Sequence, residues 1–245
     1  MKKIYFDEGH GKSKDPGAVG NGLIESDVVL KISKYTENHL RANYTGFEIL
    51  NTRKDHTFLT LEARAAKANK WKADVFFSFH ANSAVSSSAT GYEDFIYSKT
   101  TSADTENLQN TIHNQVIPVL KKYGIANRGK KRANHSVTRS STMPAILTET
   151  LFVSNQKDAA LLKNEQFLKD ISAAYSEGLA TYLKLKKIKP VSSPQTTPSA
   201  TPSSKKVYRV IVDGKQVSAY SNYDNIANEV KKHLGRAREV KVVAK

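Results

Sequence analysis

His10 lies between two glycines in the segment Asp7–Gly11, directly after the apolar run Ile4–Phe6. This pattern predicts a tight turn at the carboxyl end of a strand, where open α/β sheets carry their functional groups. The flanking glycines let a backbone, a metal ion or a substrate approach closely. His10 is therefore a candidate metal ligand, and an exposed loop histidine without chemistry is the alternative.

Two further residues could complete a metal site with His10. His80 ends a second predicted strand, in Phe77–Asn82, and Glu25 begins a predicted helix. The alternative for His80 is a core histidine with its hydrogen bonds satisfied. The alternative for Glu25 is a carboxylate that is placed there only because the helix dipole stabilises it. The chain has no Cys, so any metal must be held by His and carboxylates. Two histidines and a glutamate would leave one position open for water, as in a catalytic zinc site.

Glu149 follows the apolar residues of a predicted strand, Ala145–Thr150. A carboxylate there must be solvated in a cleft, paired or close to a metal, because burying it without a partner is costly. Hydrolysis at a zinc site needs one more acid, which takes a proton from water and delivers it to the leaving nitrogen. Glu149 is the candidate for that role.

Five short motifs are spread over residues 1 to 186 in an order and spacing found in one family. They are Asp7–Gly11, Asp15–Ala18 leading into Gly22–Glu25, Ser78–Asn82, Asn127–Gly129 and Leu147–Glu149. Together they resemble the zinc-dependent N-acetylmuramoyl-L-alanine amidases (amidase type 3 family) found in sporulation lysins, bacterial autolysins and phage endolysins.

The resemblance implies a hydrolase that cleaves the amide between N-acetylmuramic acid and the first L-alanine of the peptidoglycan stem peptide. It implies one Zn2+ ion held by His10, Glu25 and His80, with Glu149 as the catalytic acid and base. It also implies that Asn82 and Arg128 contact the substrate. In so basic a chain, Arg128 could equally be a solvated charge.

The chain departs from the family pattern at Glu8, where the family usually has proline. The extra charge could raise metal affinity or point to solvent, and we expect it to be tolerated because Gly9 and Gly11 still define the turn. Asp7 could orient His10 as a hydrogen-bond acceptor or have a structural role at the strand end.

Apolar runs with strand patterns alternate with helical patterns through the first 186 residues. This alternation predicts an α/β fold with a mostly parallel, twisted sheet and helices on both faces. Strands are expected at 3–7, 47–51, 75–79, 91–97 and 145–150, and helices near 27–42, 59–71, 103–122 and 166–185.

Composition divides the chain into three parts. Residues 1–186 form the expected catalytic domain, and 187–205 are a Pro/Ser/Thr-rich linker with little to bury. Residues 206–245 predict a small basic ββαβ-like module. Its segment Tyr208–Val217 resembles the C-terminal wall-targeting modules of phage amidases from Gram-positive hosts, so we expect a cell-wall-binding module. An inert appendage or a dimerisation unit is the alternative.

A net charge of +15 favours an anionic partner, which could be nucleic acid, acidic lipid or a wall polymer. The sequence carries no nucleic-acid-binding signature and no segment with the 18 to 20 apolar residues of a membrane span. We therefore expect peptidoglycan and the anionic wall polymer of a Gram-positive bacterium as partners. We expect no nucleic acid, no membrane insertion and a monomer.

The first residues run into a strand without a secretory signal, which predicts synthesis in the bacterial cytoplasm. Access to the wall would then follow holin-type release, as for a phage or prophage endolysin, or cell lysis. Two other functions stay open. One is a zinc peptidase that cuts within the stem peptide, and the other is a non-catalytic binder of wall or polyanion.

Overall fold

The computed structural model describes residues 1–188, 207–220, 226, 229–230, 232–233 and 239–244. The chain divides into two units, Met1–Pro190 and Val191–Lys245. Nearly all of the predicted linker, 187–205, lies outside the described residues. Two of its residues are described: Lys187 continues strand β10 (Lys186–Lys187), and Ile188 donates its N–H to the carbonyl of Asn43 at 2.8 Å.

The first unit is built on a six-stranded sheet with the order β5-β1-β6-β9-β7-β8. Strands β5, β1, β6 and β9 are parallel, whereas β7 runs antiparallel to β9 and β8 runs parallel to β7. This arrangement confirms the mostly parallel sheet. The strands are β1 (Lys2–Glu8), β5 (Phe47–Asn51), β6 (Val75–Asn82), β7 (Tyr92–Tyr97), β8 (Asn127–Ala133) and β9 (Ala145–Phe152).

Strand β8 was not among the predicted strands. Its segment Arg128–Arg132 holds four cationic residues and a glycine, a composition that hides strand character. It lies at the edge of the sheet, where charged side chains reach water and discourage pairing with another chain.

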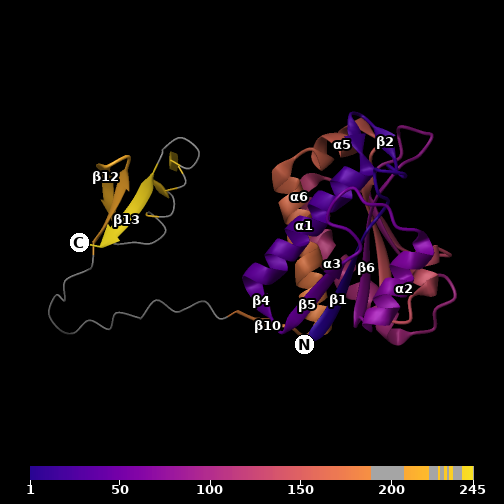
Figure 1. Cartoon of the computed structure of the whole chain (residues 1–245). Helices are drawn as coiled ribbons and strands as arrows, with labels where there is room; N and C mark the ends of the chain where they lie inside the picture. Colours follow the sequence, from indigo (N-terminus) through magenta and orange to yellow (C-terminus); the bar gives the residue numbers. More distant parts are fainter. Residues whose placement is uncertain (189–206, 221–225, 227–228, 231, 234–238, 245) are drawn as a thin grey trace. The chain divides into compact units, whose positions relative to one another are not determined.

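Helices cover both faces of the sheet, as expected (Figure 1). One layer contains α1 (Glu25–Asn43), α3 (Ala103–Tyr123) and α6 (Glu165–Leu183), which pack over the larger apolar core. The other face carries α2 (Leu61–Trp71) and the short α4 (Ser136–Ser140), which contact each other and a smaller core. Helix α5 (Gln156–Leu162) follows β9 and packs against α6.

Strand alternation decides which residues face the α2 side of the sheet. Successive side chains of a strand point to opposite faces, so Asp7 belongs to the α2 side and Glu8 to the α1 side. The register pairs Asp7 with Ser78 and His80 with Glu149. Asp7, Ser78, His80 and Glu149 therefore share one face near the carboxyl ends of parallel strands.

Short elements complete the first unit. The hairpin of β2 (Val19–Gly20) and β3 (Leu23–Ile24) leads straight into α1, and β4 (Tyr44–Thr45) pairs with β10. Polar side chains cap the N-termini of four of the described helices. Thr60 caps α2, Ser102 caps α3, Asn155 caps α5 and Asn164 caps α6, each by accepting backbone N–H groups of the first turn.

The second unit contains a three-stranded antiparallel sheet of β11 (Tyr208–Val212), β12 (Lys215–Tyr220) and β13 (Val240–Ala244), in the order β12-β11-β13. Asp213 and Gly214 both have positive φ, 47° and 81°, as a tight hairpin turn between β11 and β12 requires. The predicted helix near 223–234 lies largely outside the described residues. In the described parts of both units, no helix combines the length and the apolar character needed to span a bilayer.

Candidate metal centre

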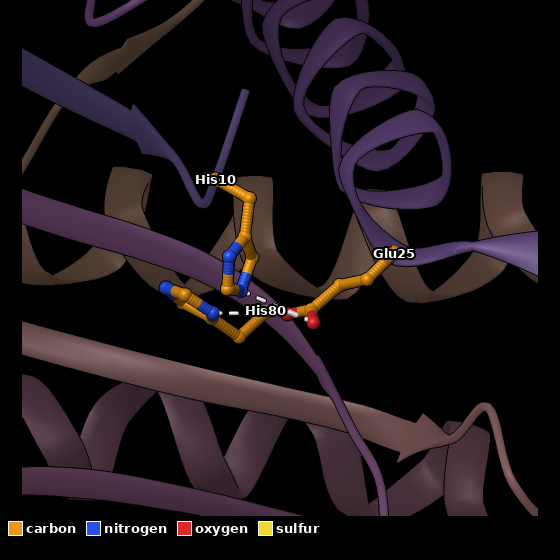
Figure 2. A group of neighbouring side chains, drawn as sticks. All are labelled: His10, Glu25 and His80. Carbon is orange, nitrogen blue, oxygen red and sulfur yellow. Dashed lines mark hydrogen bonds and ion pairs between the residues drawn. The ribbon is translucent and has the colours of Figure 1, made fainter. Parts of the chain in front are cut away.

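Three segments of the first unit bring His10, Glu25 and His80 together (Figure 2). His10 lies in the turn after β1, Glu25 is the first residue of α1, and His80 lies in β6. One ligand atom from each residue lies within 4.8 Å of the others, and the described residues contain no second group of this kind. The Glu25 carboxylate links the imidazoles, with Oε2 3.1 Å from His10 Nε2 and Oε1 3.0 Å from His80 Nδ1.

The turn that carries His10 depends on its glycines. A Cβ atom on Gly9 would lie 2.5 Å from Cε1 of His80, and one on Gly11 would lie 2.4 Å from the carbonyl oxygen of Thr57. His10 itself has a positive φ of 63°, which is uncommon for a residue with a side chain. Glycine is therefore required on both sides of His10, because the His80 ring lies against residue 9 and the backbone of Thr57 lies against residue 11.

Asp15 orients the imidazole of His10. Its Oδ2 lies 2.8 Å from His10 Nδ1, so the other ring nitrogen, Nε2, faces Glu25. Asp15 is fixed in turn, because its Oδ1 accepts the N–H of Gly17 and its backbone bonds with that of Gly11. A carboxylate on the second nitrogen is the usual partner of a metal-ligating histidine. Asp7 does not have this role. It is fully buried and accepts hydrogen bonds from Thr52, Arg64 and Ser78, so its role is structural.

Charge and burial oppose each other in this cluster. Burial would raise the pKa of Glu25, but its bonds to the two histidines hold that pKa well below the usual range. Burial would lower the pKa of both imidazoles, yet Glu25 outweighs it. The pKa of His10 is raised and that of His80 rises to about 9. Backbone N–H groups of Ala18 and Ala81 also donate to Glu25, which fixes the carboxylate in place.

The donor set fits a zinc ion. Imidazole nitrogen and carboxylate oxygen are ligands that zinc accepts, and three such ligands leave a fourth position for water or substrate. His10 and His80 also line a cavity of about 360 Å³. Its other lining residues are Asp7, Gly9, Asp15, Phe58, Leu59, Leu61 and Arg64. Two of the three candidate ligands are therefore accessible from this cavity.

Glu149 lies on β9 directly beside His80. Its Oε2 is buried, and no described group forms a hydrogen bond with it. Burial raises the pKa of Glu149 to about 7, with smaller contributions from neighbouring charges. A carboxyl group with a pKa near neutrality can both accept and return a proton.

Asn82 and Arg128 converge on a residue that the sequence did not single out, Glu93 of β7. Asn82 Nδ2 donates to Glu93 Oε1 at 2.7 Å, and Arg128 Nε donates to Oε2 at 2.7 Å. Lys131 also pairs with this carboxylate. Arg128 is therefore held by Glu93, with its guanidinium 4.9 Å from the ring centre of Phe152, and is no freely solvated charge. The register places Glu93 opposite Glu149.

Comparisons with known proteins assign the chain to a family. Residues 4–181 match the family model described as N-acetylmuramoyl-L-alanine amidase. The chain belongs to this amidase family. It is an N-acetylmuramoyl-L-alanine amidase and a peptidoglycan hydrolase, which confirms the resemblance carried by the five motifs.

Individual relatives of this amidase cover most of its chain. The endolysin of Bacillus phage SPP1 is 42% identical over 212 residues, which are 86% of this chain and 76% of the relative. The sporulation-specific N-acetylmuramoyl-L-alanine amidase of Bacillus subtilis (strain 168) is 37% identical over 228 residues, 93% of this chain and 80% of the relative. The catalytic domain of CwlV from Bacillus (Paenibacillus) polymyxa var. colistinus superimposes with a TM-score of 0.70 at 35% identity. It covers 76% of this chain and 100% of that domain.

Glu8 of the amidase points neither to solvent nor toward the histidines. It is fully buried on the α1 side of β1, where Ser33 donates to it at 2.5 Å and Asn51 at 2.8 Å. The backbone N–H of Arg53 donates to its second oxygen at 3.2 Å. Burial raises the pKa of Glu8 and these three bonds oppose that rise. Of the two alternatives left open for Glu8, a solvent-facing carboxylate is wrong, because strand alternation turns residue 8 into the α1 layer.

Sequence reasoning also missed Asp15, Glu93 and the arginines around the turn. Asp15 was within a quoted motif, so its position was visible although its partner was not. Glu93 lies in a strand that was predicted, and an acid inside a buried strand was the available signal.

We expect Gly9→Ala to lose zinc binding, because the new Cβ atom would occupy the space of the His80 ring. Zinc content of the purified amidase after dialysis measures the effect, and circular dichroism checks the fold. Ser13→Ala, an exposed residue of the same loop, is the control and should keep its zinc. Wild-type zinc content in folded Gly9→Ala would contradict this account of the turn.

Proposed function

We propose that the amidase holds one zinc ion with His10, Glu25 and His80 and uses Glu149 as its acid and base. The observation that carries this proposal is the convergence of three candidate ligand side chains beside Glu149. The Oε2 atom of Glu149 is buried and has no hydrogen-bond partner among the described residues. When bound, zinc supplies a Lewis acid that polarises the scissile carbonyl and makes water easier to deprotonate.

Glu149 moves the proton in this scheme. Its ionised carboxylate takes a proton from the attacking water as oxygen adds to the lactyl carbonyl carbon. It then returns that proton to the alanine nitrogen as the carbon–nitrogen bond breaks. The products are a lactyl carboxylic acid and a free amino group on alanine, and transfer of the second water proton from the acid to the amine gives a carboxylate and an ammonium group. A pKa of about 7 suits both transfers at neutral pH, since neither is strongly uphill.

Asn82 and Arg128 are proposed to contact the substrate beside Glu149. The guanidinium of Arg128 uses Nε for Glu93 and has a long 3.4 Å contact from Nη1 to the carbonyl of Thr90. Its side chain is 35% exposed, so donors remain for a carboxylate or carbonyl of the stem peptide. Glu93 fixes the direction in which these donors point.

The domain division supports a second contact with the wall. We propose that residues 1–186 form the catalytic domain and that residues 187–205 form a linker. We propose that the basic module of residues 206–245 binds an anionic wall polymer of a Gram-positive bacterium. The module carries nine Lys and Arg residues against four Asp and Glu residues. Attraction of this kind weakens as salt screens the charges.

The products of peptidoglycan digestion identify the bond that the amidase cuts. Purified peptidoglycan incubated with the amidase should release stem peptides with a new amino-terminal L-alanine, identified by end-group labelling and mass spectrometry. A chelator should stop the release and added zinc should restore it. A new amino terminus at a later stem residue would indicate a peptidase instead. Binding without any new amino group would indicate a non-catalytic wall protein.

Glu149→Gln should fold and bind zinc but lose activity by about 100- to 10,000-fold, because the amide cannot accept the proton. The rate of amino-group release from peptidoglycan measures the loss. Glu62→Gln changes an exposed glutamate of α2 and should leave the rate unchanged. Wild-type rates in Glu149→Gln would remove Glu149 from the mechanism.

His10→Ala and His80→Ala should each lose zinc, because each removes one of three proposed ligands. Elemental analysis of the purified, folded variants provides the measurement. His39→Gln is the matched control, since His39 bonds to Ser176 between α1 and α6 and should leave the metal content unchanged. Unaltered zinc in either alanine variant would count against the ligand assignment.

A further inference from the structure

Three consecutive carbonyl groups of the turn that carries His10 accept hydrogen bonds from two buried guanidinium groups. Arg53 donates to the carbonyl of Glu8 at 3.1 Å and to that of Gly9 at 2.7 Å. Arg64 donates to the carbonyl of Glu8 at 2.6 Å and also to that of His10. Every carbonyl from residue 8 to residue 10 is therefore held by an arginine.

Arg53 also reaches the segment that supplies Glu25. Its Nη2 donates to the carbonyl of Ser26 at 2.8 Å, one residue after Glu25 and in the first turn of α1. The same nitrogen donates to Gly9. One guanidinium thus joins the backbone beside His10 to the backbone beside Glu25.

Arg64 connects the turn to the strand that supplies His80. Its Nη1 donates to Asp7 Oδ1 at 2.8 Å, and the other oxygen of Asp7 accepts the hydroxyl of Ser78 at 2.7 Å. Ser78 precedes His80 by two residues in β6 and lies on the same face. Arg64 and Asp7 therefore form a continuous link from the His10 turn to β6.

Both arginines are buried, with 4% of Arg53 and 2% of Arg64 exposed. Burying a guanidinium is costly unless its donors and its charge are satisfied. Arg64 pairs with Asp7, whose negative charge offsets that of the guanidinium. Arg53 donates to four backbone carbonyls, those of Glu8, Gly9, Ser26 and Asp55. Both guanidinium groups are therefore satisfied where they lie, and they hold the backbone around the site in place.

The turn needs such support because His10 adopts a left-handed backbone conformation. A non-glycine residue in this region persists only where surrounding contacts hold it there. Bonds to each carbonyl of the turn supply those contacts without touching the imidazole.

We propose that Arg53 and Arg64 are positioning residues that preorganise the three metal ligands by clamping the turn at residues 8–10 to α1 and β6. The proposal rests on the zinc site proposed above. A clamped turn places His10 before the ion arrives, so less ordering remains to be done on binding. Lysine keeps the charge at either position but lacks the planar fork that bonds several carbonyls at once.

The test measures zinc affinity in the full chain of Arg53→Lys and Arg64→Lys by competition with a chromogenic chelator. Partners that orient metal ligands typically contribute about 10- to 100-fold to metal affinity, so each Kd for zinc should rise by about that factor. Far-UV circular dichroism of the metal-free proteins should keep the wild-type shape. Leu120→Ala is the control, because it removes a buried side chain of α3, a helix that supplies none of the proposed metal ligands. It should lower thermal stability while leaving the zinc Kd unchanged.

The possible outcomes distinguish failure of the arginine clamp from failure of the proposed zinc site. Wild-type protein that binds no zinc would overturn both the metal site and the clamp. Zinc binding by the wild type with an unchanged Kd in both lysine variants would overturn the clamp alone. A rise in Kd for Leu120→Ala equal to theirs would also overturn it, because general destabilisation would then explain the effect. If a lysine variant does not fold, Asp7→Asn weakens the ion pair with Arg64 and should raise the zinc Kd, and an unchanged Kd would overturn the clamp.

Discussion

The carboxylate of Glu25 lies between two imidazoles, and the arrangement of the proposed metal site depends on holding it there. Its two oxygens face His10 and His80, and two backbone N–H groups fix its orientation. These three residues come from a turn, a helix start and a strand, so no local sequence preference can assemble them. The parallel sheet brings the three segments to one edge, and the hairpin before α1 delivers Glu25 to that edge.

Strand alternation places neighbouring acidic residues on opposite faces of the sheet. Asp7, His80 and Glu149 belong to the α2 face, and Glu8 belongs to the α1 face. Asp7 thereby pairs with Arg64, whereas the Glu8 carboxylate accepts the backbone N–H of Arg53 on the other face, and both arginines donate to the backbone carbonyl of Glu8. The turn between Gly9 and Gly11 is therefore held from both faces of the sheet, and it supports His10, a proposed metal ligand.

Environment separates the roles of two carboxylates that face each other on β7 and β9. Glu93 pairs with Arg128 and Lys131, and these cations lower its pKa against the effect of burial. Glu149 has no such partner on its Oε2 among the described residues, and burial raises its pKa to about 7. One carboxylate therefore stays ionised and positions Arg128, while the other is suited to carry a proton.

The sequence by itself determined the amidase family, the alternation of strands and helices and the residues that meet at the sheet edge. Local patterns can be recognised in a sequence without a structure. Here they are the glycines around His10, the apolar runs before His80 and Glu149, and the order of the five motifs. Only the tertiary structure decided that Asp15 orients His10 in place of Asp7. It also decided that Glu8 is buried, that Arg128 bonds to Glu93 and that a basic segment forms edge strand β8. These are partnerships across 5 to 45 residues of chain, and side-chain pairing at such separations is set by packing, which a single sequence does not display.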